Sequence, residues 1–353
     1  MSHDLDSYNY SYPNELVALD PLAAKDQANM LVFKKNSFSH QRVCDLLKYV
    51  SASDLLVFNN TRVMPCRLTG QRVRASSTNK ANTKPKVSVT LNKAIDGNVW
   101  TTFCKPLKKL KKGDRIIFSK DLSAEVVSIN FAQCVMNFES GKKKLITCLK
   151  EIGDMPLPPY IIKKREHKKA DFKSYQTPFA EIDGSVAAPT ASLHFPDDYL
   201  LSLKRKNIPY CFITLHVSGG TFAPIREKNI DKHKMHSEFA SVDENAALQI
   251  RETLKKGGKL IAVGTTVMRV LESSIFVDNG FQAFNGSIDT FIKPGHDFKV
   301  CSGLFTNFHM PKSTLFILVN AFLGIKKANE LYELAIEKRY RLFSYGDCCL
   351  LFP

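Results

Sequence analysis

The sequence lacks any paired cysteine motif. Its nine cysteines include no C-x-x-C pair and no Cys/His cluster with zinc-finger spacing. Most of them lie in apolar runs such as residues 209–217, where a cysteine packs as a small hydrophobic side chain. These absences disfavour a disulfide-stapled secreted scaffold and a zinc module, and they predict reduced, buried thiols in a cytosolic protein.

Long apolar runs and nucleotide-binding glycine motifs are also missing. The longest apolar stretch, residues 313–323, is interrupted by Asn320 and is too short to span a bilayer. No charged start followed by an apolar run opens the sequence, so we expect a soluble, cytoplasmic protein without a membrane partner. No G-x-G-x-x-G follows a strand and no G-x-x-x-x-G-K-[ST] occurs, which disfavours a Rossmann-type methyltransferase and a P-loop nucleotide hydrolase.

Size and charge indicate a globular protein that binds polyanions. With 353 residues, 44% hydrophobic and 24% charged, the chain can bury a sizeable core in two domains. Its 50 Lys and Arg against 34 Asp and Glu give a net charge of +16. Such a surface attracts nucleic acid, and the alternative is a solvated, lysine-rich surface without a partner.

The first half of the sequence predicts a small β-barrel inserted into a larger domain. A strand is expected at residues 54–59, and from residue 63 short β-rich runs follow one another between turn residues. These runs span residues 86–91, 99–103, 115–118, 124–129 and 133–138. We therefore predict an antiparallel barrel at 63–153 within a large α/β domain made of 1–62 and 154–353. Polar residues 71–86 indicate a hairpin tip, and the proline-rich segment 155–160 a domain boundary.

The second half alternates predicted strands and helices, which is typical of a mixed α/β fold. Ser241 to Glu244 resembles a capping box ahead of a helix that ends near Gly257. A buried strand at 259–263 leads into a tight loop at 264–266 and a helix at 268–276, and further helical or buried elements are expected at 315–322 and 329–340. A loop at the carboxyl end of such a strand is where α/β proteins bind ligands.

Four segments combine glycines, hydroxyls and ionisable side chains: residues 183–195, 214–222, 233–238 and 263–272. Glycine lets a ligand approach the backbone, and histidine can transfer protons near neutral pH. Each segment also has a plainer explanation. A lone histidine is often a satisfied core residue, the His233/His236 spacing fits no standard zinc motif, and Arg269 with Glu272 could be a surface pair one turn apart.

Taken together, these segments resemble the S-adenosylmethionine:tRNA ribosyltransferase-isomerase family of queuosine biosynthesis. The matching stretches follow the family's order over nearly the whole chain: residues 55–65, 105–110, 156–161, 175–177, 184–195, 214–222, 233–238, 263–273, 306–315 and 340–347. The sequence departs from the family pattern at residues 25–29, Asn60, Ser192, Ser218 and Val267.

The resemblance implies a fold and a reaction. The fold would be a large α/β domain with an open barrel-like sheet plus an inserted small antiparallel β-barrel. The reaction would transfer and isomerise the ribosyl group of S-adenosylmethionine onto 7-aminomethyl-7-deazaguanine at the tRNA wobble position, giving epoxyqueuosine and releasing adenine and methionine. S-adenosylmethionine would be a substrate, no metal or redox cofactor is expected, and the protein would act as a monomer on tRNA.

Candidate site residues follow from these segments and from the resemblance. We expect His194 and His216 to move protons, with His233, His236 and Glu238 in support. The expected substrate-binding residues are Asn59, Thr61, Arg62, Gln176, Gly184, Ser185, Thr190, Gly219, Gly220, Thr221, Gly264, Thr265, Thr266, Arg269, Asn307 and His309. The expected tRNA phosphate contacts are Lys108, Lys109, Lys111, Lys112, Lys163, Lys164 and Arg165, and no residue is assigned to a metal.

Two other functions remain open from the sequence. One is a non-catalytic, RNA-binding relative of the same family, which the substitutions at Ser192 and Ser218 would favour. The other is a translation-associated barrel protein, which the inserted barrel and the positive charge would favour. Neither needs histidines beside glycine-rich loops.

Overall fold

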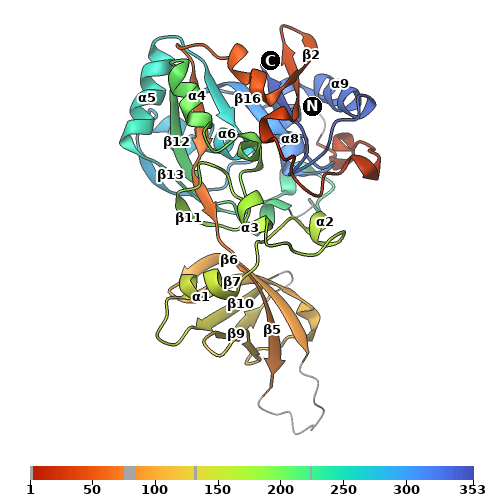
Figure 1. Cartoon of the computed structure of the whole chain (residues 1–353), viewed down its shortest axis with the longest axis vertical. Coiled ribbons are helices and arrows are strands. Elements are labelled where there is room, and N and C mark those ends of the chain that lie inside the picture. The colour runs from red at the N-terminus through yellow and green to blue at the C-terminus, as the bar shows by residue number, and fades with distance from the viewer. Residues whose placement is uncertain (1–2, 75–84, 131–132, 223–224) are drawn as a thin grey trace. The chain divides into compact units, whose positions relative to one another are not determined.

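The computed structural model describes residues 3–74, 85–130, 133–222 and 225–353, without the side chains of residues 221 and 222. The chain divides into two compact units (Figure 1). The large unit comprises Met1–Arg62, Pro158–Arg165 and Ser174–Pro353, and the small unit comprises Val63–Leu157 and Glu166–Lys173. Most of the predicted hairpin tip at 71–86 lies outside the described residues.

The small unit extends beyond the insertion that we expected at 63–153. The backbone of Asp154 pairs with that of Arg67, with N–H···O distances of 2.8 and 3.1 Å, and Met155 and Leu157 are buried. Residues 166–173 return to the same unit, where the Arg67 guanidinium lies 3.1 Å from the His167 imidazole. The proline-rich segment is thus divided between the units, because its apolar side chains before Pro158 need a core to pack against.

The small unit is a closed six-stranded barrel, as the sequence predicted. Its strands lie in the order β10-β7-β6-β5-β8-β9, and all neighbouring pairs with a described register are antiparallel. Alternate side chains of β6, namely Val87, Val89 and Leu91, are buried, as a barrel interior requires. The elements are β5 (Arg67–Val73), β6 (Lys86–Asp96), β7 (Val99–Lys105), β8 (Arg115–Ile117), β9 (Ser123–Ile129), β10 (Cys134–Glu139), η5 (Leu107–Lys109), α1 (Leu145–Ile152) and α3 (Asp171–Ser174).

The large unit is built on a nine-stranded mixed sheet, in the order β15-β13-β12-β3-β14-β16-β17-β1-β2. Its four neighbouring strands β12, β3, β14 and β16 run parallel to one another. The strands are β1 (Asn29–Lys34), β2 (Ser37–Arg42), β3 (Leu55–Asn59), β12 (Tyr210–Leu215), β13 (Glu238–Val242), β14 (Leu260–Val263), β15 (Phe284–Ile288), β16 (Cys301–Asn307) and β17 (Cys348–Leu351). Two short strands, β4 (Thr61–Val63) and β11 (Ile182–Ser185), pair separately.

Both faces of this sheet are covered, because successive side chains of its strands point to opposite sides. In β3, Leu55 and Val57 join one apolar core and Leu56 and Phe58 the other. The first core is completed by α5 (Glu244–Lys255), α6 (Thr265–Leu271), α8 (Thr314–Leu323) and α9 (Ile325–Glu337). The second is completed by α4 (Tyr199–Arg205) and η4 (Val43–Lys48). Figure 1 shows α5 and α4 beside β12 and β13.

Shorter helices make up the connections. They are α2 (Pro159–Ile162), α7 (Ser274–Asp278), η1 (Leu5–Tyr8), η2 (Asn14–Leu16), η3 (Lys25–Gln27), η6 (Thr190–His194), η7 (Gly219–Phe222) and η8 (Ile230–Lys232). None of the helices described has the length and apolarity needed to cross a membrane. Among the described residues all nine cysteines are free thiols, and only Cys44 is exposed.

Three local predictions were wrong. Ser241 lies inside β13, and the side chain of Asp243 caps α5 by accepting a 2.7 Å hydrogen bond from the Ala246 N–H. The expected tight loop at 264–266 is instead the start of α6, with Gly264 at its N-cap. The helix expected at 268–276 is two helices, since α6 ends at Leu271 and α7 begins at Ser274.

Candidate active site

The parallel strands of the large unit bring the predicted segments to one edge of the sheet. The carboxyl ends of β12, β3, β14 and β16 are adjacent, since these strands are neighbours and point the same way. The residues that follow or end them are His216, Asn59 with Thr61, Gly264 to Thr266, and Asn307 with His309. This edge is where open α/β sheets bind their ligands.

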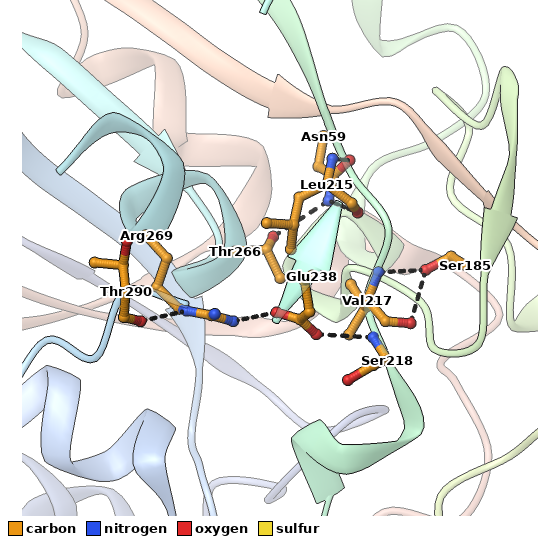
Figure 2. A network of polar contacts seen from close by, with 9 residues as sticks. All are labelled: Asn59, Ser185, Leu215, Val217, Ser218, Glu238, Thr266, Arg269 and Thr290. Atoms are coloured by element: carbon orange, nitrogen blue, oxygen red, sulfur yellow. Dashed lines mark hydrogen bonds and ion pairs between the residues drawn. The ribbon is translucent and has the colours of Figure 1, made fainter. Parts of the chain in front are cut away.

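Asn59 joins three of these elements. Its Oδ1 accepts hydrogen bonds from the backbone N–H groups of Thr61 (3.0 Å) and Leu215 (3.1 Å). Its Nδ2 donates to the Leu215 carbonyl at 3.0 Å and lies 3.4 Å from Thr266 Oγ1 (Figure 2). Because Asn59 is fully buried and its amide is saturated by the protein, it fixes the geometry of the edge and leaves no polar group for a ligand.

His216 is held by contacts on several sides. Its Nδ1 lies 2.8 Å from Thr61 Oγ1, and its ring stacks on that of Phe239 at a centroid distance of 5.6 Å. A Cβ on Gly184 would lie 2.6 Å from the His216 Nε2, so only glycine fits there. Burial lowers the pKa of His216, against the opposing charge of Asp183. The imidazole is therefore neutral at pH 7 and partly accessible.

A buried charged network supports the turn after β12 (Figure 2). The Glu238 carboxylate accepts a 2.8 Å hydrogen bond from the Ser218 N–H and a 2.5 Å hydrogen bond from Nη1 of Arg269. Arg269 Nε in turn donates to the Thr290 carbonyl at 3.0 Å. The side chains of Glu238 and Arg269 are only 2% and 3% exposed, so the pair is shielded from solvent.

Arg269 and Glu272 do not form the surface pair that their spacing allowed. Both are buried, and Glu272 accepts hydrogen bonds from the backbone N–H groups of residues 299–301 at 2.7–3.0 Å. Burial acts to raise the pKa of Glu272, but His296 and these N–H groups outweigh it, so the pKa lies below its usual range. Glu272 thus anchors the start of β16.

Ser185 and Gly220 shape the backbone of the site. The Ser185 hydroxyl donates to the Ala187 carbonyl at 2.7 Å and accepts from the Val217 N–H at 2.9 Å. A Cβ on Gly220 would lie 2.2 Å from the His236 ring, so this glycine gives the imidazole room. Gly219 lies in the same turn, and the side chain of Thr221 lies outside the described residues.

A second polar chain runs through the end of β16. Thr190 Oγ1 donates to Asn307 Oδ1 at 3.0 Å, and Asn307 Nδ2 lies 3.1 Å from His194 Nε2 and 3.2 Å from the Phe343 carbonyl. Since an amide nitrogen can only donate, His194 Nε2 is the acceptor and the proton sits on Nδ1. Burial, aided by the charge of Arg341, lowers the pKa of His194 to about 3.

His309 occupies a similar buried position. Its Nε2 lies 2.9 Å from Thr306 Oγ1, and its backbone N–H donates to the Tyr332 hydroxyl at 2.9 Å. Burial lowers the pKa of His309 to about 3. Both His194 and His309 are therefore uncharged at neutral pH and act as hydrogen-bonding groups.

Two adjoining cavities open beside these chains. The larger, about 340 Å³, is lined in part by Tyr160, Phe308 and Phe343 and by Lys163 and Lys312. The smaller is lined by five predicted binding residues, Thr190, Gly264, Thr265, Thr266 and His309. Thr190, His309 and Leu315 line both cavities, so they form the shared wall.

Another cavity, of about 500 Å³, lies against β12 and α5 and is polar. Asn60, Glu181 and Asp243 line it, and Asn60 Oδ1 accepts a 2.7 Å hydrogen bond from the Thr214 hydroxyl. It is larger, but among the predicted site residues none lines it. The cavities around Thr190 and His309 are therefore the better candidate.

Several predicted residues lie apart from these cavities. The Arg62 guanidinium donates to the Ala180 carbonyl at 2.9 Å and lies 3.8 Å from Asp183, so it secures the 180–183 segment. Gln176 is half-buried and lines none of the three cavities. His233 packs edge-on against Phe291. The pKa of His233 is lowered mainly by burial and further by the charge of the nearby His236.

The predicted phosphate contacts fall on both units. Lys108, Lys109, Lys111 and Lys112 are exposed in the small unit, and Lys163 and Lys164 are exposed in the large unit. Arg165 is engaged within the large unit instead, since its Nε donates to the Leu19 carbonyl at 3.1 Å and lies 3.2 Å from Asp20.

The residues that complete the larger cavity were not among those predicted from the sequence. Tyr160, Lys312, Leu315 and Phe343 lie in the matching stretches 156–161, 306–315 and 340–347, but aromatic and lysine side chains there carried no chemical signal of their own. Within the described part of the chain, no group of three or more His, Cys, Asp or Glu side chains is arranged to hold a metal ion.

Comparison with known proteins identifies the family of this chain. The sequence profile of the family described as "Queuosine biosynthesis protein" matches residues 5–351. S-adenosylmethionine:tRNA ribosyltransferase-isomerase from Ruegeria sp. (strain TM1040) is 41% identical over 99% of both chains. The enzyme of the same name from Halothermothrix orenii is 40% identical over 98% of this chain and 99% of its own.

A solved structure is similar along the whole chain. The crystal structure of S-adenosylmethionine tRNA ribosyltransferase from Thermotoga maritima has a TM-score of 0.54 and 27% identity, covering 98% of this chain and all of that one. The matched length, the identity and the shared architecture agree, and the chain belongs to the queuosine biosynthesis family of S-adenosylmethionine:tRNA ribosyltransferase-isomerases.

Proposed function

We propose that this enzyme transfers the ribosyl group of S-adenosylmethionine to 7-aminomethyl-7-deazaguanine at the wobble position of tRNA and isomerises it to the epoxycyclopentane of epoxyqueuosine. Adenine and methionine leave in the process. The protein acts as a monomer in the cytoplasm, where tRNA is available, and needs no metal or redox cofactor. The tRNA and S-adenosylmethionine are both substrates.

One observation carries the proposal. The carboxyl ends of four adjacent parallel strands bring Thr61, His216, Gly264, Asn307 and His309 to one edge of the sheet. Of these residues, Gly264, Asn307 and His309 line two joined cavities. The larger cavity, about 340 Å³, is at the small end of the range of ligand sites, about 300–1,000 Å³. Its aromatic walls suit a planar heterocycle. The smaller cavity, about 30 Å³, adds the hydroxyls of Thr265 and Thr266 beyond the shared wall.

The chemistry requires a base, a way to stabilise departing adenine and exclusion of water. The sulfonium makes a ribose C5′ proton acidic, and its removal gives an ylide. The ylide electrons expel the ring oxygen from C4′, and this oxygen forms a carbonyl at C1′ as the bond to adenine breaks and adenine takes up a proton. The aminomethyl nitrogen adds to C4′ and loses a proton, which restores the ylide. The ylide carbon adds to the carbonyl, and the alkoxide formed displaces sulfur from the same carbon, so that the epoxide closes and methionine leaves.

We assign the base role to His216 and positioning roles to His194 and His309. A neutral imidazole with a pKa of about 3, as in His194 and His309, accepts a proton poorly at pH 7. Burial lowers the pKa of His216 as well, but its ring is partly accessible, and Thr61 occupies only Nδ1. His194 holds Asn307, and Asn307 holds Thr190 in the wall between the cavities.

The reaction is tested by mass spectrometry of an incubation with S-adenosylmethionine and tRNA bearing the aminomethyl-deazaguanine wobble base. We expect the mass gain of an epoxycyclopentane-diol on that nucleoside, with adenine and methionine released in equal amounts. Tight binding of both substrates without product would instead favour the non-catalytic, RNA-binding relative. In that case Ser192 and Ser218 are the first positions to restore to glycine.

Replacing His216 by glutamine tests the base. Glutamine can still hydrogen-bond Thr61 but cannot take up the proton, so we expect kcat to fall by about 10²–10⁴-fold with little change in KM. The matched control is His40→Gln, because the His40 Nδ1 also lies 2.8 Å from a single hydroxyl, that of Tyr340, on a strand far from the site in the sheet order. An equal loss in both variants, or a loss confined to KM, would contradict the assignment.

A further inference from the structure

The connection between β7 and β8 in the small unit carries a dense positive charge. Residues 105–112 include five lysines and no acidic residue. All five, Lys105, Lys108, Lys109, Lys111 and Lys112, are exposed, whereas Leu110 between them is buried and ties the segment to the barrel. We call residues 105–112 the lysine loop.

The lysine loop is held in one conformation by two arginines of the neighbouring strand. Arg72 and Arg74 both donate to the Lys109 carbonyl, Arg74 at 3.0 Å. Arg74 also donates two hydrogen bonds to the Asp114 carboxylate, with Nε–Oδ1 and Nη2–Oδ2 distances of 2.6 and 3.1 Å. Asp114 accepts the Lys111 N–H at 2.9 Å, so the backbone on both sides of Leu110 is fixed.

Asp114 stays charged in this position. Its side chain is 3% exposed, and burial acts to raise its pKa. The hydrogen bonds from Arg74 and from the Lys111 N–H outweigh burial, so the pKa of Asp114 lies below its usual 3.8. One buried carboxylate therefore organises the backbone of a segment whose ammonium groups all point outward.

The lysines themselves have no acidic partner. Within the described residues none of the five forms an ion pair, whereas Lys143 in the same unit lies 2.7 Å from Glu151 and 3.5 Å from Asp121. Like charges held close together repel one another, and the repulsion is relieved when a polyanion binds. A segment fixed before binding also loses less conformational entropy when it does so.

We infer that the lysine loop is the surface through which the small unit binds the phosphates of RNA. That the RNA is tRNA rests on the proposed function. Backbone contacts of this kind set the position of a nucleic acid without reading its sequence, which suits an enzyme that finds its specificity at one modified base.

The test is the salt dependence of binding to an unmodified tRNA transcript. In the variant K108Q/K109Q/K111Q/K112Q, we expect the slope of log Kd against log salt concentration to become shallower by about three units, as for the loss of four phosphate contacts. At physiological salt the affinity falls by about tenfold or more. The variant K108R/K109R/K111R/K112R keeps the charge and retains the binding.

The matched control removes four other exposed lysines of the same unit: Lys93, Lys120, Lys142 and Lys144. It changes the net charge equally and should alter the slope by less than one unit. An equal loss in the two variants would show that only net charge matters and would overturn the inference. Because the transcript lacks the reactive base and no turnover is measured, failure of the proposed reaction would leave this result intact.

Asp114→Asn tests whether the fixed backbone of the lysine loop contributes to RNA binding in addition to its charge. This change removes one negative charge next to the lysines, so charge alone predicts tighter binding of RNA. Loss of the Arg74 anchor predicts binding several-fold weaker, and tighter binding would overturn the role of the fixed conformation. The fluorescence of Trp100, on β7 of the same barrel, reports whether the unit stays folded. If it does not, the lysine variants decide, since they leave the buried contacts unchanged.

Discussion

Replacing Arg269 by methionine is expected to lower the free energy of unfolding of the large unit by about 3–5 kcal/mol. The substitution leaves the Glu238 carboxylate, 2% exposed, without the guanidinium that lies 2.5 Å from it. Loss of the cationic partner of a buried carboxylate is among the most destabilising changes a single substitution makes. Tryptophan fluorescence would miss the effect, because Trp100 lies in the small unit. Hydrogen exchange of the β13 amides, measured at increasing urea concentrations, reports the stability of the large unit directly.

A second substitution identifies the cause. Glu238→Gln in the Arg269→Met background removes the buried negative charge yet keeps an oxygen that can accept the Ser218 N–H, so most of the stability should return. A double variant as unstable as Arg269→Met would mean that lost packing, and not the charge, is responsible. The exposed pair Lys256–Glu252, at 3.6 Å, is the matched control, and Lys256→Met should leave the stability unchanged within error.

Acid is expected to destabilise the large unit through His194 and His309. Burial lowers both pKa values from 6.5 to about 3, so each imidazole stays neutral in the folded protein while it takes up a proton in the unfolded chain. As the pH falls below 6.5 the unfolded state binds more protons, and the free energy of unfolding falls by about 1.4 kcal/mol per pH unit for each histidine. The loss continues down to about pH 3, where the folded-state groups also titrate.

Urea unfolding measured from about pH 7 to about pH 4 checks this dependence. Carboxylates contribute to the slope in every variant, so the comparison is between slopes. His194→Gln and His309→Gln should each flatten the slope by about 1.4 kcal/mol per pH unit, and the double variant by the sum. Curves that run parallel to that of the unsubstituted protein would contradict the burial of both imidazoles. Loss of stability at a single pH is not informative, because either substitution also removes a hydrogen bond.

The same titrations bear on catalysis. If His194 and His309 stay neutral throughout the working range, the acidic limb of a rate profile comes from another group, and His216 is our candidate. His216→Gln should remove that limb, whereas a limb that persists in His216→Gln would move the base role elsewhere.

The pattern of the sequence predicted which segments the large sheet brings to one edge. Glycines, hydroxyls and histidines follow buried apolar runs at residues 54–59, 209–217 and 259–263, and parallel strands bring their carboxyl ends together. The barrel was predictable for a similar reason, since its short alternating runs need closure to satisfy both edges. Both predictions depend on local periodicity, which the sequence displays directly.

The pairing of individual side chains was not predictable. Arg269 has Glu272 one turn away, but it binds Glu238, 31 residues earlier, because β13 lies next to β12 in the sheet and its first residue faces α6. Likewise, Asp243 rather than Ser241 caps α5, since β13 continues to Val242. Such choices depend on strand order and register, which connect residues far apart and leave no trace in local spacing.

The order of strands in the large sheet also fixes when each part of the protein can fold during synthesis. β1, at residues 29–34, pairs with β17, at 348–351, and β3 lies between β12 and β14. β1 can pair at once with β2, but its other edge waits for β17, made about 300 residues later, and β3 waits for β12 and β14, made about 150 to 200 residues later. The strands of the barrel, from 67 to 139, are complete among themselves and can close long before that. Until then the nascent chain exposes β3, four of whose five residues are apolar, with both strand edges unpaired, which favours aggregation.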